Sequence, residues 1–151
     1  MQRINLILLV LVLPFMGRAA ETCPWLNAAT AGGVLGSAVI ATITHENSNR
    51  DDVACNFAGV SSLRIGVQTM DPPRAEFTAR SAQCGSDPAP LKAIGNEAVV
   101  CTTDKRSAQV VGRVRNRIFT ILISTTDASL TQAALREKAR DVAEHVAGNL
   151  F

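Results

Sequence analysis

The stretch QVVGRVRNRIFTILIST, residues 109–125, contains two runs of apolar and β-branched residues on either side of the dipeptide Arg115-Asn116. Two such runs separated by a two-residue turn are typical of a β-hairpin. Arg-Asn is a weaker turn than Asn-Gly, because only the Asn adopts a positive φ readily. The stretch therefore predicts two adjacent antiparallel strands in the second half of the chain.

Four other segments have the composition of strands. They are SAVIATITHE at 37–46, ACNFAGV at 54–60, SSLRIGVQTM at 61–70 and the segment 97–102, which follows a Gly-Asn turn. In the segment 61–70, apolar residues alternate with polar or small ones, which predicts a strand with one buried face. The apolar set is Leu63, Ile65 and Val67, and the alternating set is Arg64, Gly66 and Gln68.

Two short segments are predicted as helices in the first half of the chain. LNAATAGGVLG has the capping residue Asn27 at its start and Gly36 just past its end. DPPRAEFTARSAQ begins with Asp71 at a cap position and has prolines in its first turn. We expect Phe77 to anchor this second helix to the core.

The C-terminal segment AALREKARDVAEHVAGNLF is predicted as a long amphipathic helix. Ser129 and Gln132 have the spacing of a capping box at its start. Apolar residues recur at intervals of three and four and predict a single buried stripe. These residues are Leu135, Ala139, Val142, Val146 and Leu150.

The predicted order is helix, three strands, helix, three strands and a long helix, with a stiff connection at Pro88 and Pro90. Strands joined by short turns favour antiparallel pairing. The sequence thus predicts an α+β fold: an antiparallel sheet of about five to six strands, with helices packed on one face. We expect residues 20–151 to form a single domain, because a chain of about 130 residues can bury a hydrophobic core.

The N-terminus has the features of a secretory signal peptide: MQR precedes the apolar run INLILLVLVLPFM at residues 4–16. A helix of this length spans about 20 Å, which is shorter than a hydrocarbon core of about 30 Å. Small residues around Ala19 predict removal of residues 1–19, with Ala20 as the alternative cleavage position. The mature chain is then periplasmic or secreted, with no stable membrane insertion. An uncleaved membrane anchor is the alternative reading.

The composition limits the partners that we expect. Removing the signal peptide removes Arg3 and Arg18 and leaves 13 basic and 13 acidic residues. A neutral domain gives no reason to expect nucleic acid as a partner. Trp25 and four Phe are the aromatic residues that remain, and the chain has no Tyr, which argues against a surface for stacking sugars or bases. No cofactor is predicted.

Four cysteines in an exported chain are typical of two disulfide bonds. Three pairings are possible, and we favour Cys23–Cys55 and Cys84–Cys101, because each closes a moderate loop within its own half of the domain. By loop entropy, each bond stabilises the fold by roughly 3 to 4 kcal/mol. Thr22 directly before Cys23 does not fit a lipid-attachment signal, so lipidation is not expected.

Metal binding and catalysis have weaker support. Zinc sites use closely spaced cysteines, whereas no two cysteines here are closer than seventeen positions. His45 and His145 have no partner at metal-ligand spacing, so no metal is predicted. No Gly-x-Ser-x-Gly motif occurs, and Asp51 and Asp52 are expected to be solvated in a polar turn. An enzyme that uses Glu97 or His45 as acid or base is the alternative.

Arg113, Arg115 and Arg117 form the one local concentration of charge worth weighing as a binding site. With the turn at residues 115–116, the three guanidinium groups would crowd one end of the hairpin. Such a group could hold a carboxylate or a phosphate, because each guanidinium offers a planar fork of donors. The alternative is a solvated hairpin tip that keeps the sheet edge soluble.

Several segments together resemble a group of small exported bacterial envelope domains of unknown function. They are a capped helix that starts after a cysteine and ends in LG, the IGNEAVVC turn and strand, the VGRVRNRIFTI hairpin and the VAEHVAGNLF helix. In layout the group is similar to the disulfide-tied extracellular sensor domain of some bacterial serine/threonine kinases. The resemblance covers most of the mature chain, is most specific at residues 94–99 and 112–121, and implies no catalytic residue.

The export signal, the cysteines and the lack of a catalytic motif favour one class of function. We expect an exported, non-enzymatic binding or sensor-like domain of the cell envelope. Its partner would be an envelope protein or a small ligand. The alternatives are an enzyme of unrecognised type and a purely structural envelope protein.

Overall fold

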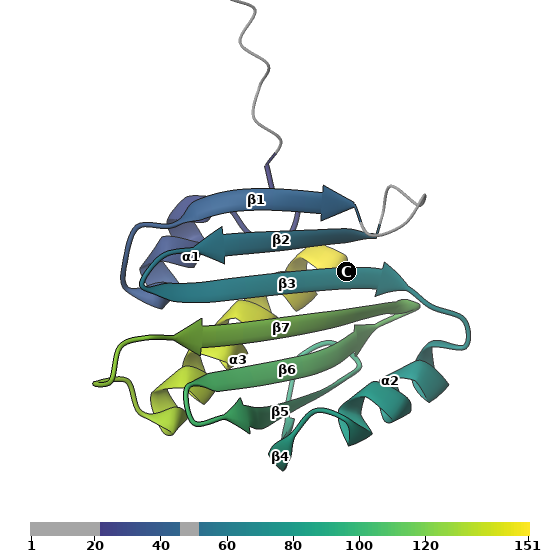
Figure 1. The fold of residues 1–151 in the computed structure, drawn as a ribbon. Coiled ribbons are helices and arrows are strands. Elements are labelled where there is room, and N and C mark those ends of the chain that lie inside the picture. The colour runs from purple at the N-terminus through teal and green to yellow at the C-terminus, as the bar shows by residue number, and fades with distance from the viewer. Residues whose placement is uncertain (1–21, 46–51) are drawn as a thin grey trace, which may run out of the picture.

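The computed structural model describes residues 22–45 and 52–151, which form one antiparallel sheet and three helices (Figure 1). The predicted signal peptide, residues 1–19, and Asp51 of the predicted polar turn lie outside these residues. The helices are α1 (Ala28–Leu35), α2 (Pro73–Ala82) and α3 (Gln132–Leu150). The strands are β1 (Ile40–His45), β2 (Val53–Ala58), β3 (Ser61–Thr69), β4 (Ser86–Leu91), β5 (Glu97–Asp104), β6 (Ser107–Val114) and β7 (Arg117–Thr125).

The seven strands are ordered β1-β2-β3-β7-β6-β5-β4, and every neighbouring pair is antiparallel. The predicted hairpin is confirmed as β6 and β7, which pair from Ser107↔Ser124 to Val114↔Arg117. β7 also pairs with β3 along its whole length, so it joins the two halves of the sheet. The α+β class, the antiparallel pairing and the long C-terminal helix are therefore confirmed.

The strand count exceeds the predicted five to six because β4 forms where a stiff connection was expected. β4 contains Pro88 and Pro90 and pairs only with β5 at the end of the sheet. Proline cannot donate a hydrogen bond to a second neighbour, and an edge strand has no second neighbour. The register shifts between Ser86 and Ala89, and Asp87 between them has a positive φ of 51°.

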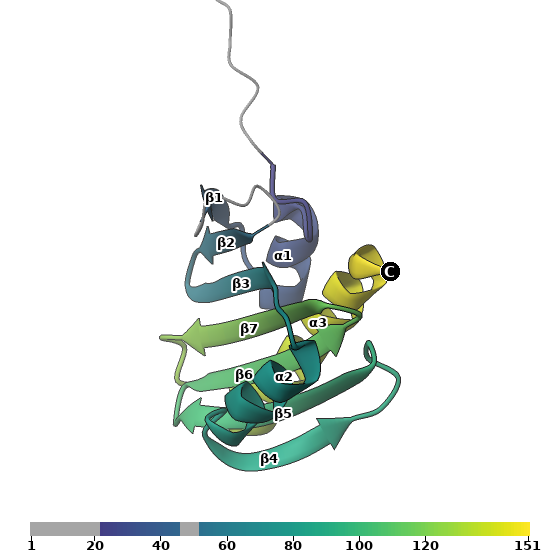
Figure 2. The ribbon, with the colours of Figure 1, turned by 90° about the vertical axis from the view of Figure 1, so that its right-hand side faces the viewer.

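The helices lie on both faces of the sheet, whereas the sequence predicted one face. Figure 2 shows α1 and α3 together on one side of the strands and α2 apart from them. Neighbouring residues of β6 explain the difference, because Val110 belongs to the core under α3 while Val111 packs with Phe77 of α2. The expected anchoring role of Phe77 is confirmed, but it anchors α2 to the second face.

The main core lies between the sheet and α3. The predicted apolar stripe of α3 is confirmed, since each of its five residues is at most 5 % exposed. On the sheet, the predicted alternation of β3 is also confirmed, with Leu63, Ile65 and Val67 buried in this core. α1 contributes Ala31 and Leu35 to the same core.

The helix ends agree with the sequence for α1 but not for α2 or α3. Asn27 accepts from the Thr30 N–H at 2.8 Å, and Gly36 adopts the left-handed conformation past the end of α1. The N-cap of α2 is Pro72, without a side-chain cap, rather than Asp71. The N-cap of α3 is Thr131, so the predicted capping box of Ser129 and Gln132 is wrong.

Ser129 has a different role, in the turn before α3. Its hydroxyl and its backbone N–H both donate to Asp127 Oδ1, at 2.7 and 2.8 Å. These two bonds hold the pKa of Asp127 below its usual value. The acceptor that caps α3 is instead the Thr131 hydroxyl, which accepts from the Ala134 N–H at 3.2 Å.

Asp52 is also placed differently from the expectation that it is solvated. Its side chain is buried, with the residue 5 % exposed, just before β2. One carboxylate oxygen accepts from the Thr69 N–H at 2.8 Å, at the end of β3. A buried carboxylate needs such a donor, because desolvating it without one is costly. Asp52 therefore ties the start of β2 to the end of β3.

The two predicted disulfide pairings are confirmed. Cys23–Cys55 links the segment before α1 to β2, and Cys84–Cys101 links the end of α2 to β5. All four cysteines are buried. Each bond thus fixes a helical segment to its own half of the sheet, one on each face.

The Thr131 cap gives a test that separates the observed helix start from the predicted one. We expect Thr131→Ala to lower the free energy of unfolding by about 1 kcal/mol, because the Ala134 N–H loses its acceptor. Ser129→Ala should have a smaller effect, since its side chain does not cap α3. Urea unfolding of both variants measures the difference, and a larger loss for Ser129→Ala would contradict the assignment.

The disulfides give a second test of stability. The paired substitution Cys23→Ala with Cys55→Ala opens a loop of 32 residues, and Cys84→Ala with Cys101→Ala opens one of 17. We expect each pair to lower the free energy of unfolding by roughly 3 to 4 kcal/mol, with the greater loss for the longer loop. Urea unfolding without reductant measures both. If a double variant is as stable as the natural protein, the disulfide that it lacks contributes little to the free energy of unfolding.

Candidate functional site

The sheet face that carries α2 is polar where the helix does not cover it. On β3 the residues that alternate with the buried apolar ones point to this face, and β7 and β6 contribute residues beside them. Together with α2 they enclose a hollow of about 370 Å³. It is lined by Arg64, Gly66, Gln68, Arg80, Gln109, Thr120 and Leu122. We call this the open-face hollow.

The depth of the open-face hollow depends on Gly66. A Cβ atom built on Gly66 would meet no other atom within 4 Å, so the space above this residue is empty. Thr120 lies directly across from Gly66 on β7, and Leu122 lies across from Arg64. The floor is therefore a flat patch of sheet with one missing side chain, and α2 forms the wall beside it.

Arg80 projects from α2 into the open-face hollow and is held in place at two atoms. Its Nε donates to Glu76 Oε1 at 2.6 Å, one helical turn earlier, and its Nη2 donates to Gln68 Oε1 at 2.7 Å. A guanidinium group has five N–H donors, and these two bonds occupy only two of them. The group is thus oriented before any ligand arrives, with donors to spare.

The electrostatics of the open-face hollow favour a negatively charged group. Its lining includes two arginines, Arg64 and Arg80, and no Asp or Glu among the residues that the structure describes. Glu76, which is one helical turn before Arg80 and forms an ion pair with it, offsets part of the charge of Arg80. The remaining polar groups are a hydroxyl and two amides, on Thr120, Gln68 and Gln109. They can both donate to and accept from the oxygens of a ligand.

The three arginines of the predicted anion site do not converge in the structure. Residues 114 and 117 form the last pair of the β6–β7 hairpin, so Arg117 shares the face of Val114. Arg113 must then point to the opposite face, because side chains alternate along a strand. With a two-residue turn between the strands, Arg113 and Arg117 therefore point to opposite faces of the sheet. This alternation of side chains can be counted from the sequence, but the prediction that the three arginines crowd one end of the hairpin did not take it into account.

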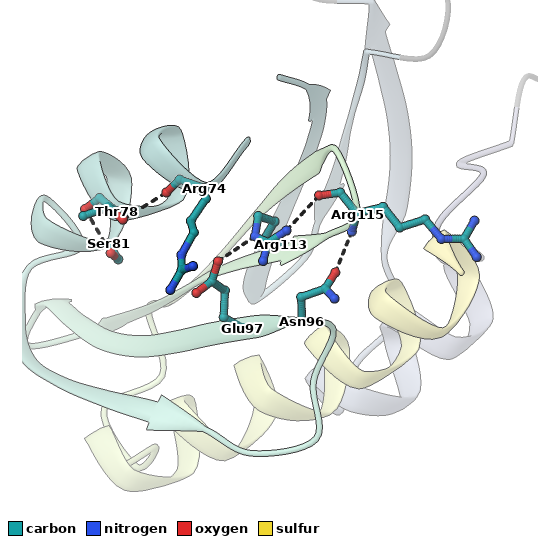
Figure 3. A network of polar contacts seen from close by, with 7 residues as sticks. All are labelled: Arg74, Thr78, Ser81, Asn96, Glu97, Arg113 and Arg115. Atoms are coloured by element: carbon teal, nitrogen blue, oxygen red, sulfur yellow. Dashed lines mark hydrogen bonds and ion pairs between the residues drawn. The ribbon is translucent and has the colours of Figure 1, made fainter. Parts of the chain in front are cut away.

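Arg113 is held by the neighbouring strand (Figure 3). Its Nε donates to Glu97 Oε1 at 2.6 Å, and its Nη1 donates to the carbonyl of Arg115 at 3.0 Å. The Arg115 N–H in turn donates to Asn96 Oδ1 at 2.6 Å. Figure 3 also shows Arg74 of α2 pointing toward Glu97. Arg113 thus links β6 to β5 and to the turn.

Arg115 and Arg117 lie at the other side of the hairpin. The Arg117 guanidinium sits 5.7 Å from the ring centre of Trp25, a distance typical of a cation–π contact. Both arginines line a polar hollow of about 300 Å³ with Asn116 and the end of α3. The positive φ of the turn falls on Arg115, at 56°, and not on the Asn. Anion binding by these residues stays a prediction.

The two residues named as alternative acid or base groups lie far apart. His45 ends β1 at one edge of the sheet, whereas Glu97 begins β5, five strand positions away. That separation is about 24 Å at the usual strand spacing. Glu97 is engaged by Arg113, and His145 lies exposed on α3. Within residues 22–45 and 52–151, no three His, Cys, Asp or Glu side chains are grouped to hold a metal ion.

Comparisons with other proteins do not assign a function to this site. No protein family, curated protein or solved structure matches the chain. No helix in the described residues is both long and apolar enough to cross a membrane. The open-face hollow must therefore be interpreted from its own residues.

Sequence reasoning missed the open-face hollow, although part of its signal was visible. The alternation in β3 had already placed Arg64, Gly66 and Gln68 on the face opposite the core. The wall residue Arg80 could not be added, because the sequence did not show that α2 packs on that same face. Gln109 and Thr120 required the strand order as well, since β6 and β7 follow β3 only after some forty residues.

The hairpin arginines give a matched pair of substitutions. We expect Arg113→Ala to lower the free energy of unfolding by about 1 kcal/mol, because its partly buried contact with Glu97 is lost. Arg115→Ala should stay within about 0.5 kcal/mol, since its side chain is exposed and only its backbone is bonded. Urea unfolding measures both. The reverse order would mean that Arg115, and not Arg113, holds the hairpin.

Proposed function

We propose that the protein is an exported, non-enzymatic binding domain of the cell envelope that holds an anionic small ligand in the open-face hollow. The observation that carries this proposal is the placement of Arg80 by Glu76 and Gln68 above an unfilled floor at Gly66. Two buried disulfides are compatible with an oxidising compartment outside the cytoplasm.

The geometry favours a carboxylate or a phosphate as the group that is bound. An arginine that is already oriented loses little side-chain entropy on binding, and its donor fork matches the oxygens of such groups. Arg64 adds a second positive charge on the opposite side of Gly66 along β3. A volume of about 370 Å³ lies at the lower end of small-molecule sites, so the ligand is a metabolite-sized acid and not a polymer.

The lining supports binding and not chemistry. A hydrolase or transferase needs a nucleophile beside a base, and a proton carrier needs a group that titrates near neutral pH. The lining supplies the Thr120 hydroxyl, but no His, Cys, Asp or Glu occurs among the described residues of the hollow. Arginine and amide side chains orient a ligand and stabilise its charge, which is what a binding or sensor-like domain requires.

Titration of the isotope-labelled protein with simple anions tests this proposal. The probes are inorganic phosphate and succinate, with glucose as the uncharged control. We expect saturable shifts of the backbone amide signals of Gly66, Gln68 and Thr120 with both anions and none with glucose. For probes of this size, dissociation constants on the order of 1 mM are expected.

Three variants make the test specific. Gly66→Leu should obstruct the floor of the hollow and abolish the shifts while the fold is retained, because a Cβ atom at this position meets open space. Arg80→Gln should weaken binding about tenfold or more, since it removes a charged donor. Arg140→Gln removes the same charge from the exposed face of α3 and should have no effect. Shifts confined to Arg115 and Arg117, or undiminished binding by Gly66→Leu, would refute the assignment to this hollow.

A further inference from the structure

The two edges of the sheet are unequally protected against pairing with another strand. β4, at one edge, has two prolines, a register shift and a residue with positive φ, and each of these features prevents a further strand from pairing. β1, at the other edge, has none of them. Its sequence IATITH contains no proline, no glycine and no Lys, Arg, Asp or Glu.

β1 also leaves an apolar side chain uncovered. Ile40 is 74 % exposed, the highest value among the large hydrophobic residues of the described chain. It lies across from Ala58 of β2, whose small side chain covers little of it. Among the described residues, no strand pairs with the backbone N–H and C=O groups on the outer side of β1. An uncharged, β-branched edge of this kind is a template for strand pairing.

We propose that β1 pairs with β1 of a second copy of this chain, antiparallel, across a two-fold axis perpendicular to the sheet. Paired residues must share a face, so only registers that pair residues of equal parity are allowed. The register centred on Thr42 places Ile40 beside Thr44 of the second copy, and Ala41 beside its Ile43. This register pairs residues 40–44 and covers Ile40 in both copies. The register centred on Ala41 pairs only residues 40–42 of the strand, and the register centred on Ile43 leaves Ile40 outside the paired residues.

Two features favour a second copy over a different partner as the occupant of this edge. The strand is uncharged, so two copies meet without like charges opposed, which would otherwise destabilise the pair. The arrangement is also closed, because the protected β4 edges lie at both outer ends and stop further growth. One open edge and one protected edge per chain produce a dimer and not a fibre.

The pairing has a consequence for the arrangement of the molecule. A two-fold axis perpendicular to the sheet leaves both open faces on the same side, so the two hollows face the same way. The inference does not depend on what those hollows bind. The contact is one strand of six residues, about 20 Å long, which is small beside standard interfaces of about 1,600 Å². The dimer is therefore weak, with a dissociation constant on the order of 100 μM.

Sedimentation equilibrium of the mature, disulfide-bonded chain measures this association over a range of concentrations. The variants are Thr42→Lys and Thr42→Glu, which place like charges at the two-fold axis. Ser62→Lys is the matched control. It adds the same charge to the same face of the sheet, at an exposed position on β3 that lies away from the edge. Thermal unfolding of each variant confirms that the fold is retained, since both positions are exposed.

We expect a concentration-dependent dimer for the natural chain and for Ser62→Lys, and a monomer for either Thr42 variant alone. An equimolar mixture of Thr42→Lys and Thr42→Glu should dimerise again, because opposite charges then meet at the axis. A monomeric natural chain up to about 1 mM would overturn the proposal, as would dimers of Thr42→Lys as strong as those of the natural chain. Failure of the mixture to dimerise would overturn the register centred on Thr42.

Discussion

The pairing of β7 with both β3 and β6 is the constraint on which the structure depends. β1 to β3 form one half of the sheet and β4 to β6 form the other, and among the strands of the described residues only β7 pairs with both halves. β7 is packed on both faces, with Phe119 buried in the α3 core and Ile118 buried in the α2 core. Because β7 fixes the register of both neighbours, it also fixes which side chains of β3 and β6 share a face.

The open-face hollow is a direct result of this register. Gly66 of β3 is paired with Thr120 of β7, and Gln109 of β6 is paired with Leu122, so residues from three strands form one flat floor. α2 then covers only the part of that face near Phe77, where the Cys84–Cys101 bond holds its end. The uncovered remainder stays polar because water reaches it. The hollow arises because a short helix stops before it covers the whole face of the sheet.

The fold could be predicted from the sequence wherever one local pattern was strong. The β6–β7 hairpin, the stripe of α3 and the cysteine pairing by loop length required no knowledge of distant packing. β4 was missed because prolines contradict a strand in the middle of a sheet, and only the strand order shows that it lies at the edge. The side on which α2 packs depends on Phe77 meeting Val111, and sequence distance does not indicate which face that is.

The errors at Asp52 and Ser129 have a common physical cause. In both cases the residue type suggested one use of a polar group, solvation for Asp52 and capping for Ser129. The structure gives each a closer partner, the Thr69 N–H and the Asp127 carboxylate. A polar side chain bonds to whichever group the backbone brings nearest, and that group is set by turns whose geometry short motifs do not specify.

Charge shows the same contrast between proximity along the chain and proximity in space. Arg113 and Arg117 are four residues apart, yet the two-residue turn places them on opposite faces of the sheet. Arg113 forms an ion pair with Glu97, and Arg117 lies over the Trp25 ring. Arg64 and Arg80 are sixteen residues apart and line one hollow, because a strand and a returning helix bring them to the same face. In an antiparallel sheet the parity of a turn therefore decides where charge accumulates. A cluster of arginines around a tight hairpin turn in the sequence therefore need not be a cluster in space, whereas arginines far apart in the sequence can line one hollow.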